Sequence, residues 1–252
     1  MNLNKSMIVA KADLKAAMTV RFVKYGLLVL GALGPISAIL TVIATVLLVP
    51  PGPDYDLLIL FIGPTVSSIL MMFGMIPASM ISANALVGER EQRTLEPLLA
   101  TPLTDRELLL GKMLSSLIPS AILLYGGTII SIVVENSVFL VLGRPLLLIP
   151  DLAGMFLVFV GGPLMIIGIV SFMILISGRV SRVYEAYQTT GFVILIAFIP
   201  MFVPMAFLET GLDMNAIWLT NIVTVLIAAI FMCVTFLLAI TRFNRDKLTS
   251  MV

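Results

Sequence analysis

Six long stretches of the chain contain no charged residue, and this pattern restricts the fold more than any other feature of the sequence. A helix needs about 20 apolar residues to cross a hydrocarbon core of roughly 30 Å, and each of the six stretches is long enough. They cover residues 26–53, 57–88, 113–134, 152–178, 186–208 and 214–241. The sequence therefore predicts an all-α integral membrane protein with six transmembrane helices.

Composition agrees with this prediction. The chain is 60% hydrophobic and only 12% charged, whereas a soluble domain carries about 25% charged residues. The net charge of +1 gives no reason to expect a nucleic-acid partner, so the expected surroundings are a lipid bilayer. The first apolar stretch exceeds the roughly 7 to 15 residues of the apolar region in a cleaved signal peptide, and we expect it to remain as a membrane anchor.

Basic residues lie almost entirely on one side of the predicted membrane. With a cytoplasmic N-terminus, Arg144 is the only one of the 15 Lys and Arg residues on the outer side. Lys and Arg in short loops are retained in the cytoplasm. We therefore expect a multi-pass membrane protein with both termini and residues 89–112 in the cytoplasm. The expected location is a prokaryotic plasma or inner membrane.

The cytoplasmic segment 89–112 reads "EREQRTLEPLLATPLTDRELLLGK" and concentrates charge in an otherwise apolar chain. Thr94 can cap a short helix that Pro102 closes, and Thr104 with Glu107 forms a capping box for the helix that enters the third span. Between them, Leu95, Leu98 and Leu99 fall on one helical face. A solvated loop that only supplies charge needs no such face, so the leucines favour contact with a soluble partner.

The pattern E-R-E-x-x-T-L-E-x-L-L-x-T-P, followed by L-L-L-G-K, resembles the signature of the ABC type-2 family of transporter permeases. Arg93 departs from it, because the family often has glycine there. The resemblance implies that the segment meets a separate ATPase subunit and that Gly111 and Lys112 mark the return from loop to membrane helix. The residues implied in the ATPase contact are Glu89, Glu91, Thr94, Leu95, Glu96, Leu98, Leu99, Thr101 and Pro102.

The same resemblance implies the organisation of the whole chain as a single transmembrane domain, residues 1–252. Residues 1–25 are expected to form an interfacial connecting helix, 26–88 the first two spans, and 89–112 the coupling segment with its short helix. Residues 113–241 then supply spans three to six, and 242–252 a cytoplasmic tail.

The function implied is that of the permease subunit of an ATP-driven ABC exporter, which forms the translocation pathway as a dimer. A homodimer is expected in preference to pairing with a homologue. The chain lacks the phosphate-binding pattern G-x-x-x-x-G-K-[ST], so ATP and Mg²⁺ are expected on the partner ATPase and no cofactor on this chain. With no His and a lone Cys233, neither enzymatic activity nor a metal site is expected.

A stand-alone secondary transporter or channel is the alternative. Against it stands the absence of ionisable residues from the six stretches, because ion-coupled carriers commonly use such residues inside the membrane. Residues 135–151 are expected to form an outer loop with interfacial or partly re-entrant segments.

The transported substrate is left open, and an apolar or amphipathic compound is favoured over an ion. Methionines at 71, 72, 75 and 80 could hold Cu(I) or fill gaps between helices. The candidate polar groups of a pathway are Thr41, Thr65, Ser67, Ser68, Ser79, Ser116, Ser120, Thr128 and Asn221.

Overall fold

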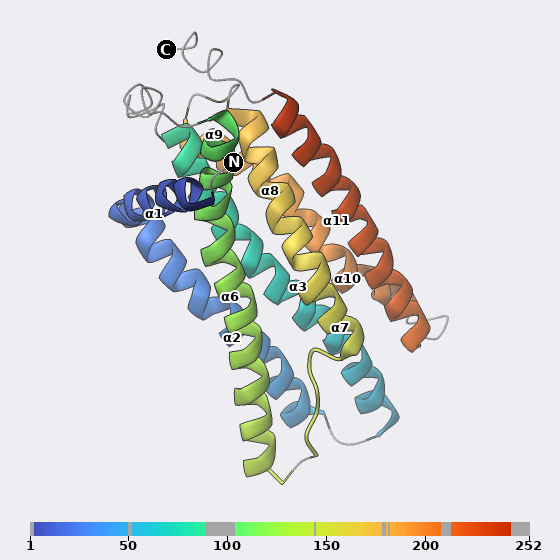
Figure 1. The fold of residues 1–252 in the computed structure, drawn as a ribbon. Helices are drawn as coiled ribbons and strands as arrows, with labels where there is room; N and C mark the ends of the chain where they lie inside the picture. Colours follow the sequence, from blue (N-terminus) through green and yellow to red (C-terminus); the bar gives the residue numbers. More distant parts are fainter. Residues whose placement is uncertain are drawn as a thin grey trace.

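The computed structural model describes residues 3–49, 52–88, 104–143, 145–177, 180, 182–207 and 213–242. Within this part of the chain every regular element is a helix, and no strand is found. Long helical rods run side by side, and the N-terminal helix lies across one end of them (Figure 1). The prediction of an all-α fold is confirmed.

The helices in the first half of the bundle are mostly long and unbroken. In chain order these are α1 (Leu3–Thr19), α2 (Arg21–Leu48), α3 (Pro53–Ala83), the π-helix η1 (Asn84–Gly88) and α6 (Asp105–Val141). Val20, in an extended conformation, separates α1 from α2 and allows α1 to turn across the bundle.

The second half is more broken. It contains α7 (Leu152–Phe156), the π-helix η2 (Leu157–Gly161), α8 (Gly162–Ser177), α9 (Val183–Ile194), η3 (Leu195–Phe198), α10 (Ile199–Phe202), η4 (Val203–Phe207) and α11 (Met214–Arg242). The breaks in the α9–η4 rod fall beside Pro200 and Pro204, which cannot donate a helical hydrogen bond. In contrast, α3 continues through both Pro64 and Pro77.

Six helices in the described part of the chain are long and apolar enough to cross a membrane, as the sequence predicts. The second and fourth spans form the centre of the bundle, because 56% of each is buried, against 28% or less of the other four. Their helices α3 and α8 pack against each other, and α6 and α11 flank them. The chain is therefore a multi-pass membrane protein.

The end of α6 differs from the expectation. The third apolar stretch stops at residue 134, but α6 continues to its last residue, Val141. Gly143 follows the C-cap residue Leu142 and has a φ of 63°, which favours glycine. Residues 145–148 then have no regular structure, and the Asp151 side chain accepts a hydrogen bond of 2.9 Å from the Gly154 amide at the start of α7.

Glu135 consequently lies inside a membrane-spanning helix, with its side chain fully buried. The expectation that the spans carry no ionisable residue is wrong. A charge at the end of an apolar stretch does not have to end the helix, because a helix can continue past a carboxylate that faces the protein interior and not the lipid.

Close packing between α6 and α8 depends on a glycine. A Cβ atom built on Gly162 would lie 2.6 Å from a methyl carbon of Leu124, which is itself buried. Such a separation is too short for two carbon atoms, so the helices approach as they do because Gly162 has no side chain.

We predict that Gly162→Ala lowers the free energy of unfolding by about 1 to 3 kcal/mol, the usual cost of overpacking a core. Gly126→Ala is the matched control, because its added Cβ would meet no atom within 4 Å. Thermal unfolding of both variants in detergent measures the effect, and equal stability of the two would contradict the packing described here.

Candidate functional site

The two described ends of the charged segment lie at the same end of the bundle as α1 (Figure 1). On one side is η1, which ends at Gly88, and on the other is Thr104, which precedes α6. The implied contact residues Glu89, Glu91, Thr94, Leu95, Glu96, Leu98, Leu99, Thr101 and Pro102 all lie outside the described residues. Their roles stay predictions.

The predicted capping box at the start of α6 is present. The Thr104 hydroxyl oxygen accepts from the Glu107 amide at 3.3 Å, and the Glu107 carboxylate accepts from the Thr104 amide at 3.2 Å. These bonds satisfy two backbone donors that the first turn of a helix leaves free. The chain's return into the bundle is thus fixed at Thr104.

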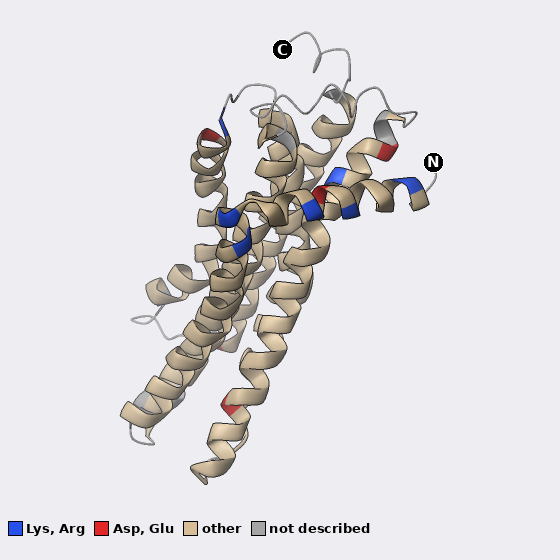
Figure 2. Cartoon of the chain, turned by 90° about the vertical axis from the view of Figure 1, so that its left-hand side faces the viewer, with Lys and Arg blue, Asp and Glu red and all other residues tan. Residues whose placement is uncertain are grey.

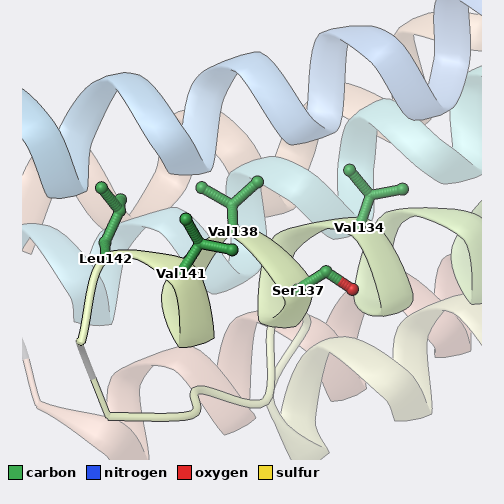
Figure 3. A pocket seen from close by; sticks show the side chains of 5 residues that line it. All are labelled: Val134, Ser137, Val138, Val141 and Leu142. Atoms are coloured by element: carbon green, nitrogen blue, oxygen red, sulfur yellow. The ribbon is translucent and has the colours of Figure 1, made fainter.

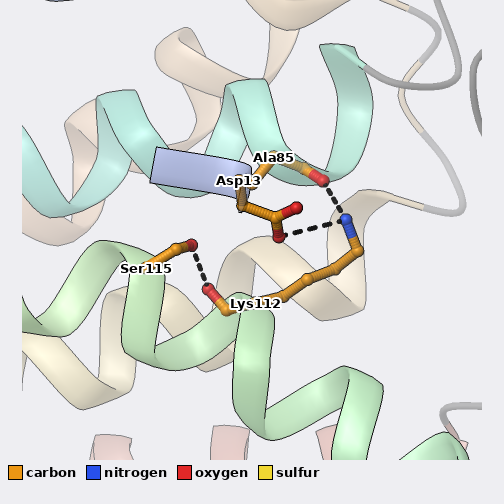
Figure 4. A network of polar contacts seen from close by, with 4 residues as sticks. All are labelled: Asp13, Ala85, Lys112 and Ser115. Carbon is orange, nitrogen blue, oxygen red and sulfur yellow. Dashed lines mark hydrogen bonds and ion pairs between the residues drawn. The ribbon is translucent and has the colours of Figure 1, made fainter. Parts of the chain in front are cut away.

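Lys112 joins three elements at this end of the bundle (Figure 4). Its ammonium group donates to the carbonyl oxygen of Ala85 in η1 at 2.7 Å and lies 3.5 Å from a carboxylate oxygen of Asp13 in α1. Both charged side chains are almost completely buried, with 3% of Lys112 and 6% of Asp13 exposed. We call Lys112, Asp13 and Ala85 the junction.

Burying the charges of the junction costs free energy, and this cost restricts how α1 and α6 can be arranged. Burial raises the pKa of the Asp13 carboxyl above its ordinary value, and Lys112 partly opposes this shift. Removing two charges from water costs several kcal/mol, which their attraction recovers only in a good geometry. Relative movement of α1 and α6 separates the pair, so the junction favours one arrangement of the two helices.

Gly111 lets α1 approach close enough for this pairing. A Cβ atom at position 111 would lie 2.6 Å from Cβ of Val9 and 2.9 Å from the carbonyl oxygen of Ser6. The expected role of Gly111 and Lys112 was to mark the return to the membrane helix. In the structure α6 begins earlier, at Asp105, and these two residues lie where α1 crosses it.

A second polar contact ties η1 to α9. The Asn84 side-chain amide donates to the Tyr187 hydroxyl at 2.6 Å and to the Met80 carbonyl at 2.8 Å. Beside it lies a cavity of about 450 Å³ next to Gly88, the last described residue before the charged segment. Its lining residues are Val20, Phe22, Asn84, Gly88, Val183, Tyr184 and Tyr187.

Basic residues gather at the end of the bundle where α1 lies (Figure 2). The side chains of Lys11 and Lys15 are exposed on α1, whereas Asp13 between them is buried. The elongated helical shafts are almost free of charge in the same view. In the described structure, this side of the bundle is therefore strongly basic. The charged segment leaves and re-enters the bundle on the same side.

Sequence reasoning missed Asp13, although a signal was available. Ser6, Val9, Ala10, Asp13 and Ala17 recur at helical spacing, and all five are buried. An acidic residue on the apolar stripe of a basic helix indicates a buried partner. No local signal indicates Ala85 or Tyr187, because their partners lie 27 and 103 positions away.

The methionines and most of the candidate pathway groups are used in packing. Met71 and Met75 belong to the main apolar core, which supports gap filling and not Cu(I) binding. The Asn221 amide donates to the Ala153 carbonyl at 2.8 Å. Five hydroxyls bond to a carbonyl of their own helix, namely those of Thr41, Thr65, Ser67, Ser79 and Thr128. In contrast, the buried hydroxyls of Ser68, Ser116 and Ser120 have no hydrogen-bond partner among the described residues.

Comparison with known families gives one match that covers nearly the whole chain. A family model described as "ABC-2 family transporter protein" matches residues 6–252. No curated protein matches the chain. The matched range includes α1, the charged segment and all six spans.

The junction makes a quantitative prediction about stability. We expect Lys112→Met or Asp13→Leu alone to lower the free energy of unfolding by about 3 kcal/mol, because each removes one member of a buried ion pair. The double variant Asp13→Leu with Lys112→Met should recover most of this loss. The measurement is denaturant unfolding in detergent, and Lys15→Ala on the exposed face of α1 is the control. If the double variant loses as much free energy of unfolding as the two single variants together, the pairing is contradicted.

Proposed function

The chain belongs to the ABC-2 family of transporter proteins, and from this premise we propose that it is the permease subunit of an ATP-driven exporter. A separate subunit hydrolyses ATP, with Mg²⁺, and docks on the segment 89–102. Two copies of this chain form the translocation pathway between the cytoplasm and the outside. The chain itself carries out no chemical reaction.

The observation that best supports coupling is the junction. The docking segment leaves the bundle after η1 and returns at Thr104. Lys112 in α6 binds Ala85 in η1, and Asp13 of α1 lies beside it. A displacement of the docking segment by an ATPase therefore reaches α3, α6 and α1 together, because the two ends of the segment are fastened to each other.

The amphipathic character of α1 supports its assignment as the interfacial connecting helix. Its exposed face carries Ile8 and Met18 together with Lys11 and Lys15. Apolar side chains beside lysines suit a helix that lies at the boundary between headgroups and acyl chains. Since basic residues are retained in the cytoplasm, we assign the α1 end of the bundle to the cytoplasmic side of a prokaryotic plasma or inner membrane.

Dimerisation is supported by the wide apolar faces that the single chain leaves open. Leu28, Ile36 and Leu40 of α2 and Ile122, Ile129 and Ile130 of α6 are all exposed. Lipid covers part of these faces, and a second copy covers the rest in our proposal.

A stand-alone secondary transporter is the second candidate, and Glu135 is the observation that favours it. A buried carboxylate inside a span is a common feature of ion-coupled carriers. The two candidates differ in one property, since only the exporter needs an ATPase subunit.

We predict that Leu98→Asp weakens copurification of the ATPase at least tenfold. A buried leucine contributes roughly 1.5 to 3 kcal/mol, and a tenfold loss corresponds to about 1.4 kcal/mol. Gln92→Asp is the control, because it adds the same charge at a position outside Leu95, Leu98 and Leu99. The measurement is quantitative pull-down from membranes that contain both subunits, alongside ATP-dependent transport in liposomes. Wild-type assembly and coupling by Leu98→Asp would remove Leu98 from the docking surface.

The proposed topology gives a separate prediction. In a Cys233→Ser background, a single cysteine at Asp213, which is exposed, should react with a membrane-impermeant thiol reagent added to intact cells. A single cysteine at Lys11, also exposed, should react only after the cells are lysed. Labelling of position 11 in intact cells would reverse the assigned orientation.

A further inference from the structure

Glu135 has no role in the coupling described above, yet its environment is unusual. The side chain is fully buried in α6, and neither carboxylate oxygen has a hydrogen-bond partner among the described residues. Polar groups buried in a protein are nearly always paired, and an ionised one without a partner costs several kcal/mol. The site therefore calls for a positive charge or for a proton.

The described basic side chains are too distant to supply that charge. Glu135 lies about 34 Å from Lys112 along the helix axis, at roughly 1.5 Å per residue. The other described basic side chains belong to α1, to the start of α2 and to the start of α9, near the junction end. The side chains of Asp54, Asp56 and Arg144 lie outside the described residues.

Two further described carboxylates, Asp151 and Asp213, lie toward the outer end of the bundle. Asp151 precedes α7 and its oxygen would lie 2.8 Å from a Cβ atom at Gly63, so it is close to α3. Asp213 is exposed and accepts from the Ala216 amide at 2.8 Å. With Glu135, these residues make this end of the bundle acidic, while the junction end is basic.

A row of hydroxyls leads along α6 to Glu135. Ser116, Ser120 and Ser131 are buried, and their oxygens have no hydrogen-bond partner among the described residues. At about 100° per residue, these three positions and Glu135 fall within roughly 100° of arc, and they extend about 28 Å along the axis. We call these four residues the polar row.

Near its outer end, α6 buries Ser131, Glu135 and Phe139, which lie one turn apart, whereas Val133, Val134 and Ser137 are exposed. At the same level as Glu135, an apolar groove lies on the neighbouring side of the helix, lined by Val134, Ser137, Val138, Val141 and Leu142 (Figure 3). Val134 and Val141 are exposed there. At the level of Glu135, α6 therefore has an exposed apolar side and a buried polar side.

We propose that a singly charged cation, a protonated primary amine or an alkali ion, binds at the Glu135 end of the polar row, with Glu135 as its anionic ligand and the Ser131 hydroxyl one helical turn away as a second ligand. The proposal rests on the function proposed above in one respect, since it treats this cation as the transported substrate or as part of it. One carboxylate neutralises one positive charge, and serine oxygens accept hydrogen bonds from an ammonium group or coordinate an alkali ion.

The ligand chemistry excludes softer metals from this row. It offers oxygen atoms and no sulfur or imidazole, and such ligands suit hard cations. A substrate that carries one positive charge therefore fits this row better than the uncharged apolar or amphipathic compound that the sequence favours.

A direct binding experiment on the purified chain in nanodiscs tests the proposal without ATP or an ATPase. Radiolabelled sodium and radiolabelled methylammonium are the two probes, at constant ionic strength in choline chloride. We expect saturable binding of at least one probe, a loss of affinity of tenfold or more in Glu135→Gln, and a smaller loss in Ser131→Ala. Ser137→Ala is the matched control, because Ser137 is exposed and bonds to the Val133 carbonyl of its own helix.

The two probes distinguish an alkali ion from a protonated amine as the bound cation. Competition of methylammonium with sodium at one site indicates a general monovalent site, and binding of one probe alone identifies the class. Absence of saturable binding by both probes in the wild-type chain would overturn the proposal. A gain of binding in Arg144→Gln, from none in the wild type, would also overturn it and would identify Arg144 as the partner of Glu135.

A second measurement avoids any dependence on the folding of Glu135→Gln. Dicyclohexylcarbodiimide reacts with protonated carboxyl groups in apolar surroundings, and mass spectrometry locates the adduct in the wild-type chain. We expect the bound cation to slow labelling of Glu135 at least fivefold at constant pH, with half-protection at the dissociation constant. An unchanged labelling rate at saturating cation would contradict binding at Glu135. Neither measurement depends on ATPase docking, so failure here leaves the exporter proposal intact.

Discussion

The buried ion pair between Lys112 and Asp13 is the interaction on which the arrangement of the junction end depends. It joins the first helix to the third span, and the bond from Lys112 to the Ala85 carbonyl brings in the end of the second span. Apolar contacts tolerate sliding, because they are numerous and non-directional. A buried charge pair does not, because separation by a few ångströms leaves two uncompensated charges in a low dielectric. The pair therefore selects one position of α1 on the bundle.

One helix, α6, links the two polar sites described in this protein. The junction lies near its start and Glu135 lies near its other end. Pro119 interrupts the hydrogen-bonding of the same helix between them, and prolines are the commonest cause of helix kinks. A force applied next to the junction thus acts on the helix that carries the polar row, and Pro119 is the position where the two parts of that helix can bend independently. In the proposed exporter, this is the physical route from ATP hydrolysis to the cation.

Most of the architecture could be predicted from the sequence, because few backbone structures are stable inside a membrane. Backbone groups in a hydrocarbon core must be hydrogen-bonded within their own segment, so a long apolar run becomes a helix. The capping box of Thr104 and Glu107 was predictable for a similar reason, since both partners are three residues apart. The end of α6 was not, because whether a helix continues past Glu135 depends on where its carboxylate points. That direction is set by neighbouring helices.

By itself, the sequence determined the helical class, the six spans, the side that gathers basic residues and the family resemblance carried by residues 89–112. All of these depend on composition and on spacings of a few residues, which act before the helices meet. Only the tertiary structure decided that Lys112 reaches Asp13 and Ala85, that Asn84 reaches Tyr187 and that Glu135 has no partner within the described residues. Each of these facts joins positions far apart in the chain, or depends on which face of a helix is covered. Burial removes water as an alternative partner, so helix packing determines which polar groups are paired and which remain to bind a ligand.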